Sequence, residues 1–279
     1  MTGAQHPRAL LARAGLRPKK KYGQNFLMDG QAARRIARLC ISGAPPPVRV
    51  LEIGAGTGAL TLALLEEGAD VTALEIDPDL AALLQAREDL TRARIVQADA
   101  LAFDYAQWAG GAPWHVAGNL PYNVATPLIA NFAEMSAGPQ SATVMVQKDV
   151  ADRLCAQPGT KAYGSLSVAV QYTMRVERAF TLGPKSFYPP PKVHSTVVQL
   201  VRRAEPAVRP ADVALFRKVV RAAFAYRRKT LANSVALALG TDRASLERAL
   251  AASNLDPEIR GERLTLDDFA RVADALAEG

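Results

Sequence analysis

Short apolar runs rich in β-branched residues alternate with longer Ala- and Leu-rich stretches between residues 48 and 148. The short runs predict β-strands, and the stretches between them predict helices. The predicted strands are 48–53, 70–76, 94–98, 115–118 and 143–147. Strands that alternate with helices pair in parallel through right-handed crossovers, so the pattern predicts a doubly wound α/β sheet. Ligands of such sheets bind at the carboxyl ends of the strands.

Two further β-rich runs, 171–180 and 193–201, flank a proline-rich turn. They predict an antiparallel pair that completes the sheet. After a proline-containing connector, the chain from Asp212 onward predicts helices only, with breaks at Gly240, Pro257 and Gly261. We therefore expect a basic N-terminal arm at 1–22, a sheet domain at 23–209 and a small all-helical domain at 210–279.

Composition places the chain among globular proteins, with 279 residues, of which 49% are hydrophobic and 22% charged. No apolar run reaches the roughly 18 residues that a membrane span needs. The two cysteines offer no disulfide framework, and the three histidines have no metal-ligand spacing, so we expect no metal site. The N-terminus lacks the apolar stretch of a secretory signal. It is Arg-rich and acid-free like a transit peptide, but it is nearly free of Ser and the first motif begins at Gly23, which favours a cytoplasmic protein over an organellar one.

Charge is segregated along the chain. Residues 1–50 carry ten basic and one acidic side chain, residues 51–100 carry three and ten, and residues 201–250 carry eleven and four. Basic segments on both sides of an acidic middle suit an RNA phosphate backbone, although a solvated basic surface explains the charge equally well.

Three glycines follow the first predicted strand, at Gly54, Gly56 and Gly58. Glycine lets the backbone turn sharply and approach a ligand closely, because no Cβ intervenes. The spacing is GxGxG, which does not match the dinucleotide-binding fingerprint GxGxxG. By itself the motif predicts either a nucleotide-binding turn or a structural tight turn.

Two acidic residues at later strand ends favour the nucleotide. Glu75 lies about twenty residues past the glycines, where a carboxylate accepts hydrogen bonds from ribose hydroxyls. Asp99 ends the third strand and can accept from an adenine amino group. Taken singly, each is more often a helix cap or a solvated turn acid. Asp77 precedes Pro78 and is the natural N-cap of the next helix, so Glu75 is the better ribose ligand.

At Asn119, Leu120, Pro121 and Tyr122, after the fourth strand, the sequence resembles the ribosomal RNA adenine dimethyltransferase family. The resemblance extends in order over residues 23 to 230 and is closest to the branch that acts on small-subunit RNA. The segments that carry it are 23–27, 54–58, Glu75, Asp99, 119–122, 147–150, 162–164, 187–193 and 223–230.

The resemblance implies a Rossmann-like class I methyltransferase sheet with S-adenosylmethionine as cofactor. Its implied substrate is a pair of adjacent adenosines near the 3′ end of small-subunit (16S) ribosomal RNA, dimethylated in an immature small subunit by a monomeric enzyme. Gln24, Asn25 and Leu27 would then close the cofactor pocket instead of forming a simple turn. The other cofactor residues it implies are Gly54, Gly56, Gly58, Glu75, Ile76, Asp99, Ala100 and Asn119.

The segment 119–122 suits an amino acceptor. An adenine amine is a poor nucleophile, and an Asn119 oxygen with the Leu120 carbonyl can hold its two hydrogens so that the nitrogen faces the methyl group. Pro121 stiffens the turn, and Tyr122 offers a ring on which a base stacks. The resemblance places Phe187 on the opposite face of the base; alone, Phe187 reads as a core residue.

Two basic clusters are candidate RNA contacts. Lys19, Lys20 and Lys21 precede the cofactor motif, and Arg227, Arg228 and Lys229 fall in a predicted helix over 216–239. Such contacts bind phosphate without reading bases. Three successive residues cannot share one helix face, so at least one of the second cluster would only be solvated.

Two other functions remain open. A large-subunit RNA adenine methyltransferase would use the same site, although Leu120 and the segment 227–230 favour the small-subunit branch. A non-catalytic ribosome-assembly or organellar transcription factor would have lost the cofactor acids or the 119–122 turn, and both are intact.

Overall fold

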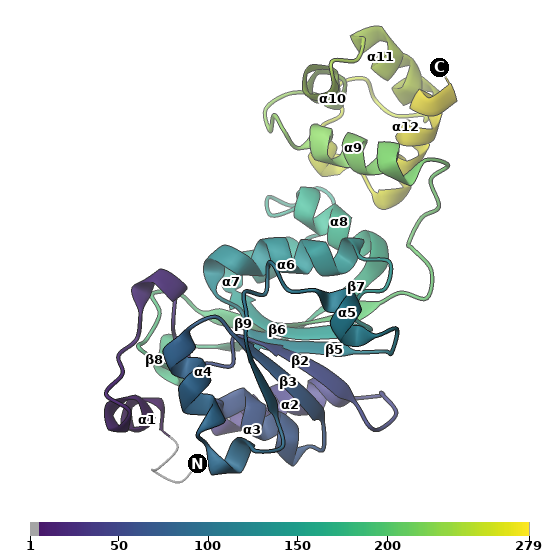
Figure 1. Cartoon of the computed structure of the whole chain (residues 1–279). Helices are drawn as coiled ribbons and strands as arrows, with labels where there is room; N and C mark the ends of the chain where they lie inside the picture. Colours follow the sequence, from purple (N-terminus) through teal and green to yellow (C-terminus); the bar gives the residue numbers. More distant parts are fainter. Residues whose placement is uncertain (1–5, 279) are drawn as a thin grey trace. The chain divides into compact units, whose positions relative to one another are not determined.

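The computed structural model describes residues 6–278, apart from the side chains of Tyr122, Asn123 and Glu278 (Figure 1). The chain forms two compact units. The first contains the residues up to Ala151 together with 176–202, and the second contains 152–175 and 203–279. The expected boundary near residue 210 therefore differs from the observed one, because an internal segment of the expected sheet domain joins the helical unit.

A seven-stranded sheet forms the centre of the first unit, in the order β4-β3-β2-β5-β6-β9-β7. The β3–β4, β2–β3, β2–β5 and β5–β6 pairs are parallel, and β9 is antiparallel to β6. This is the predicted doubly wound sheet. The strands are β2 (Arg49–Ile53), β3 (Asp70–Glu75), β4 (Arg94–Gln97), β5 (His115–Asn119), β6 (Ser141–Gln147), β7 (Met174–Leu182) and β9 (Ser195–Arg202).

The strand order reverses between β2 and β5, since the chain runs from β2 to β3 and β4 and then returns to β5 on the other side. The two strands approach closely there. A Cβ on Gly118 would lie 2.7 Å from the carbonyl oxygen of Ile53. Reversal points of this kind open a crevice at the carboxyl ends of the strands, where ligands bind.

Helices cover both faces of this sheet, with α2 and α3 on one side and α6 on the other (Figure 1). Ala33, Ile36, Ala37 and Cys40 of α2 are all buried, at the spacing of one helix face. On the opposite side, Trp114 stacks on Tyr105 with ring centroids 5.7 Å apart. The helices are α2 (Gly30–Ile41), α3 (Ala59–Glu66), α4 (Pro78–Gln85), α5 (Tyr105–Ala109), α6 (Tyr122–Glu134) and α7 (Lys148–Leu154).

The N-terminal segment, which contains the expected basic arm, packs against the rest of the first unit. It contains α1 (Pro7–Arg13), the 3-10 turn Lys20–Tyr22 and strand β1 (Phe26–Leu27), which pairs antiparallel with β8 (Phe187–Tyr188). Leu11 is 2% exposed and lies in one apolar cluster with Phe26 and Leu80. Burial of these side chains fixes the segment to the body of the unit.

The second unit is helical, and two sequence predictions fail in it. Residues 171–173 are not strand but the end of α8, where Tyr172 packs on Phe216 at 5.0 Å between ring centroids. Here tertiary burial overrides the β propensity of the segment. The predicted helix 216–239 is two helices. The helices are α8 (Ser165–Thr173), α9 (Val213–Ala223), α10 (Leu231–Leu239), α11 (Arg243–Ala252) and α12 (Leu266–Glu278).

Within residues 6–278, no helix has the length and apolar character to cross a bilayer. The same residues contain no group of three or more His, Cys, Asp or Glu side chains that could hold a metal ion.

Candidate active site

A pocket opens where the carboxyl ends of β2, β3 and β5 meet. It measures about 880 Å³, counting space open to solvent. Three strand ends, the glycine loop and the N-terminal segment all contribute to its wall. Its lining residues are Tyr22, Gly23, Gln24, Asn25, Phe26, Leu27, Glu52, Gly54, Ala55, Gly56, Thr57, Ala59, Leu60, Glu75, Ile76, Leu80, Asn119, Leu120, Pro121, Met145, Phe187 and Ser195.

The glycine loop joins β2 to α3 and forms one side of the pocket. Gly54 and Gly56 have φ values of +73° and +59°, a region that side chains with a Cβ rarely adopt. A Cβ on Gly56 would also lie 3.0 Å from the Phe26 ring. The loop therefore needs glycine both for its turn and for the close packing of the segment that covers it.

Glu75 ends β3 beside this loop and is 5% exposed. Its Oε2 accepts the N–H of Gly56 at 2.8 Å, and its Oε1 accepts the N–H of Asp77 at 3.0 Å. Burial raises the pKa of Glu75 above its ordinary value, and these backbone hydrogen bonds oppose the shift. The carboxylate is thus held rigidly at the pocket wall, where its remaining lone pairs can accept from hydroxyl groups.

Glu52 lies on β2 behind the glycine loop and is 1% exposed. Burial raises the pKa of Glu52 to about 7. Among the described residues, its Oε2 has no hydrogen-bond partner. A buried acid with one unpartnered oxygen, in the wall of a pocket, favours a ligand that carries positive charge nearby.

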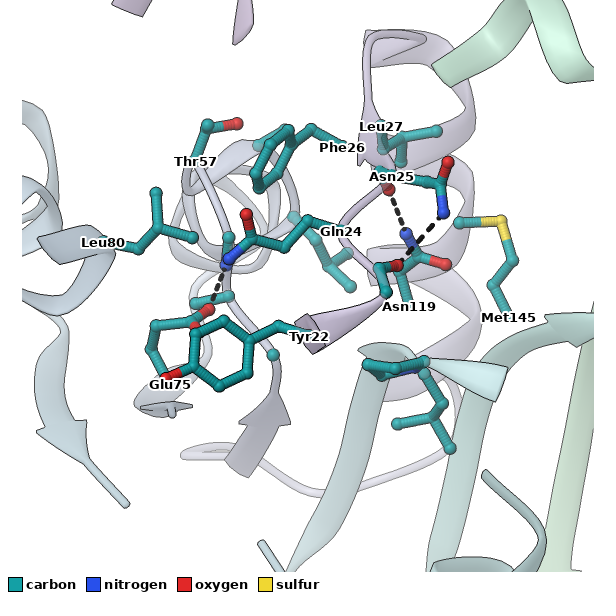
Figure 2. A pocket seen from close by; sticks show the side chains of 18 of the residues that line it. Tyr22, Gln24, Asn25, Phe26, Leu27, Thr57, Glu75, Leu80, Asn119 and Met145 are labelled. Carbon is teal, nitrogen blue, oxygen red and sulfur yellow. Dashed lines mark hydrogen bonds between the residues drawn. The ribbon is translucent and has the colours of Figure 1, made fainter. Parts of the chain in front are cut away.

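Asn119 ends β5 on the other side of the pocket from Glu75, and Figure 2 shows Gln24 and Tyr22 between them in this view. Its Nδ2 donates to the carbonyl oxygen of Asn25 at 2.8 Å. This bond sets the orientation of the amide and leaves Oδ1 as an acceptor. The neighbouring N–H of Leu120 donates to the carbonyl of Met145 at 3.0 Å, which fixes the turn that follows.

Phe187 lies at 2% exposure in the pairing of β8 with β1, where it stands opposite Leu27. It belongs to the core of the first unit and also lines the pocket. The segments 26–27 and 187–188, distant in sequence, therefore meet over the site.

The family model described as ribosomal RNA adenine dimethylase matches residues 15–278. The chain belongs to this family. Among curated relatives, the ribosomal RNA small subunit methyltransferase A of Hahella chejuensis is 43% identical and covers 93% of this chain and 93% of its own length. The protein of the same name from Pseudomonas aeruginosa is 43% identical over 94% of this chain and 96% of its own length.

Solved structures of similar fold include a dimethyladenosine transferase from Plasmodium falciparum, with a TM-score of 0.71, 23% identity and coverage of 88% of this chain and 95% of its own. The 23S rRNA methyltransferase ErmE has a TM-score of 0.69 and 25% identity, over 91% of this chain and 100% of its own. The predicted Rossmann-like class I methyltransferase sheet is confirmed.

Most of the expected cofactor residues of this chain line the pocket, but not all of them do. The lining does not include Asp99 or Ala100 among the described residues. Asp99 is exposed and its Oδ1 accepts the N–H of Leu101 at 2.9 Å, as a turn acid does. Gly58 is likewise absent from the lining among the described residues; it is the N-cap of α3, where a Cβ would lie 2.7 Å from the Leu90 side chain.

The acceptor residues are partly described. Asn119, Leu120 and Pro121 line the pocket, and Leu120 is 2% exposed. Tyr122 begins α6, and its side chain lies outside the described part of the structure.

The basic candidates separate into three kinds. Lys19 is engaged within the protein, with Nζ 2.6 Å from Asp77 Oδ1 and 2.6 Å from Asp79 Oδ2. Lys20 and Lys21 are exposed. The cluster at 227–229 is exposed and lies in the loop between α9 and α10, not on a helix.

Several lining residues escaped sequence reasoning. Tyr22 precedes the segment 23–27 and Phe26 lies within it, so the position of both in this short motif is a signal that could have indicated them. Met145 and Ser195 lie on β6 and β9 with no local signal. Their position depends on the antiparallel pairing of two strands that are distant in sequence.

Proposed function

We propose that the protein transfers methyl groups from S-adenosylmethionine to the exocyclic amines of two adjacent adenosines near the 3′ end of small-subunit ribosomal RNA, giving dimethyladenosines. The observation that carries this proposal is the oriented amide of Asn119, whose Nδ2 is engaged by Asn25 so that Oδ1 is an acceptor at the pocket. An amine nitrogen presents two hydrogens, and an acceptor fixed in advance suits it.

The residues present fit the cofactor. Glu75 offers acceptor capacity to ribose hydroxyls, and the glycine loop allows close approach by the backbone. The acid Glu52 provides negative charge behind the loop, which suits a ligand with cationic groups. When bound, S-adenosylmethionine supplies a methyl group activated on a positively charged sulfur.

The protein's own part in the transfer is to hold the acceptor in place. Asn119 Oδ1 and the Leu120 carbonyl would bind the two amine hydrogens and direct the nitrogen lone pair into the pocket. Phe187, and Tyr122 at the start of α6, would contact the faces of a base taken out of its helix. No general base is needed, because the amine proton becomes strongly acidic only after the nitrogen is alkylated.

The names of the curated relatives support small-subunit RNA as substrate, since the chain matches them over nearly its whole length. The helical second unit is the proposed RNA-binding domain, with Arg227, Arg228 and Lys229 on phosphate. We further propose that the substrate is an immature small ribosomal subunit, and that the enzyme is a cytoplasmic monomer.

Methylation of large-subunit RNA is the second candidate, favoured by the likeness to ErmE. At 25% identity this likeness is weaker than the 43% shared with small-subunit enzymes over a similar share of the chain. The small-subunit substrate is therefore preferred.

The test incubates purified protein and labelled S-adenosylmethionine with small subunits that lack this modification, and with large-subunit RNA in parallel. We expect dimethyladenosine in small-subunit RNA. Asn119→Ala should lower the rate at least about a hundredfold, as loss of a positioning group does, while cofactor affinity stays within about threefold. Calorimetry measures that affinity, and thermal melting checks folding.

Label confined to large-subunit RNA would establish the second candidate instead. Absence of label in every RNA, with S-adenosylmethionine bound normally, would favour a non-catalytic assembly factor.

A further inference from the structure

A ring of hydrogen bonds joins the N-terminal segment to the start of α4. Gln24 Nε2 donates to Asp77 Oδ2 at 2.9 Å, and the backbone N–H of Lys19 donates to Gln24 Oε1 at 2.7 Å. The Lys19 ammonium closes the ring at 2.6 Å from Asp77 Oδ1. Both the oxygen and the nitrogen of the Gln24 amide are thereby hydrogen-bonded, which ties the segment to the start of α4.

Asp77 is the fixed point of this ring. It is 1% exposed, and it also caps α4 by accepting the N–H of Asp79 at 3.2 Å. Burial alone would raise the pKa of Asp77, but hydrogen bonds from Lys19 and Gln24 lower it below its ordinary value. A buried carboxylate that loses its cation is strongly disfavoured. Displacing the N-terminal segment removes the Lys19 and Gln24 contacts of Asp77 and leaves only the helix cap.

The same segment covers the pocket from the glycine loop on one side to Asn119 on the other. Phe26 packs on Gly56 of the glycine loop, and the Asn25 carbonyl binds the side chain of Asn119 (Figure 2). Tyr22–Leu27 thus lines the pocket along the whole length of the segment, so its position sets the shape of the pocket on that side.

We propose that Lys19, Gln24 and Asp77 form a latch that holds the segment 22–27 closed over S-adenosylmethionine. Lys19 is then a positioning residue for the cofactor and not a contact to RNA. The latch also fixes the Asn25 carbonyl that orients Asn119, so closure over the cofactor prepares the acceptor site. This inference rests on the proposed function for the identity of the ligand.

The test compares Lys19→Met with Lys20→Met, which removes the same charge one residue away from an exposed side chain. Binding and release of S-adenosylhomocysteine are measured without RNA, by calorimetry and stopped-flow fluorescence. We expect Lys19→Met to bind about tenfold more weakly, mainly through faster release, because the open form becomes more populated. Lys20→Met should stay within about twofold, and Lys19→Arg should restore most of the affinity.

RNA affinity, measured separately, distinguishes a latch from an RNA contact. Under the latch, Lys19→Met leaves the dissociation constant for RNA within about twofold and raises KM for S-adenosylmethionine. Hydrogen exchange of residues 22–27 should also quicken in this variant. Asp77→Asn, which keeps the helix cap, gives a second route to the same loss of cofactor affinity should Lys19→Met fold poorly.

Equal affinity of wild type and Lys19→Met for S-adenosylhomocysteine would overturn the latch. So would weaker RNA binding with unchanged cofactor binding. A wild-type protein that fails to bind S-adenosylhomocysteine would instead overturn the proposed function, so the two failures are distinguishable.

Discussion

At the residue scale, two buried acids share one pocket wall but have different surroundings. Both oxygens of Glu75 accept backbone N–H groups, whereas Glu52 Oε2 has no partner among the described residues. Burial raises the pKa of both carboxyls. Unpaired buried acids lower stability once ionised, so Glu52 is expected to be retained for binding and not for folding.

Glu52→Gln should increase stability at alkaline pH. The pKa of Glu52 rises from an ordinary value near 4.5 to about 7 on folding, so the folded state holds a proton that the unfolded state has lost between these values. The destabilisation is absent below pH 4.5 and complete above pH 7. The gain in unfolding free energy should be about 2 kcal/mol larger at pH 8 than at pH 5.

Urea unfolding at both pH values measures this gain, with Glu66→Gln as the control because Glu66 is exposed on the next helix. An equal effect of Glu52→Gln at both pH values would show that Glu52 does not titrate in this range. Weaker binding of S-adenosylmethionine by the same variant is expected, since a negative charge is lost from the pocket wall.

At the element scale, the loop between α9 and α10 presents basic side chains from a fixed turn. Ser234 is fully buried and accepts the N–H of Tyr226 at 3.3 Å while donating to the carbonyl of Ala222 at 2.7 Å. The N–H of Lys229 donates to the carbonyl of Tyr226 at 3.0 Å. A helix would have spread the three cations around its axis, whereas this turn exposes all of them.

Replacing Arg227, Arg228 and Lys229 by Gln should weaken RNA binding and flatten its dependence on salt. Each phosphate contact that is lost lowers the slope of log K against log salt by about one, so we expect a loss of two to three. Titration of RNA binding over a salt series measures the slope. The control replaces the exposed Arg243, Arg248 and Arg271 of α11 and α12 and should change the slope less.

If the variant at residues 227–229 keeps the wild-type slope of log K against log salt, the α9–α10 loop does not contact RNA phosphate. An equal loss in both variants would show that total charge matters and that the loop has no special role.

At the scale of the whole molecule, the described residues that line the pocket all come from the first unit. They belong to the residues up to 151 or to 176–202. The basic loop belongs to the other unit. Between Asp212 and Asp242 that unit carries six basic and no acidic residues. Cofactor binding and the proposed RNA binding are thus assigned to separately packed parts of the chain.

Binding of S-adenosylhomocysteine should protect the first unit selectively from hydrogen exchange. Ligand at a hundred times its dissociation constant stabilises the state that binds it by about 2.7 kcal/mol. We expect slower exchange in 22–27, in the glycine loop and around Asn119, with little change in α9 to α12. Mass spectrometry of peptides from both units measures this, and equal protection of both units would show that they open together.

The sequence by itself determined the sheet, the glycine turn and the place of Glu75 at a strand end. These depend on the spacing of apolar residues and on the conformational freedom of glycine, which are both set within a few residues. It also indicated 119–122 as the acceptor turn, through resemblance. The role of Asp99 in binding adenine stays a prediction; in the structure its Oδ1 accepts the N–H of Leu101 in the turn after β4.

Only the tertiary structure decided which segments meet. Asn25 and Asn119 are 94 positions apart, and Lys19 and Asp77 are 58 apart, so no local pattern predicts their contacts. Lys19, expected as an RNA contact, instead pairs with Asp77, because a buried carboxylate is strongly stabilised by a neighbouring cation. Likewise, 152–175 joined the helical unit because its apolar side chains are buried there.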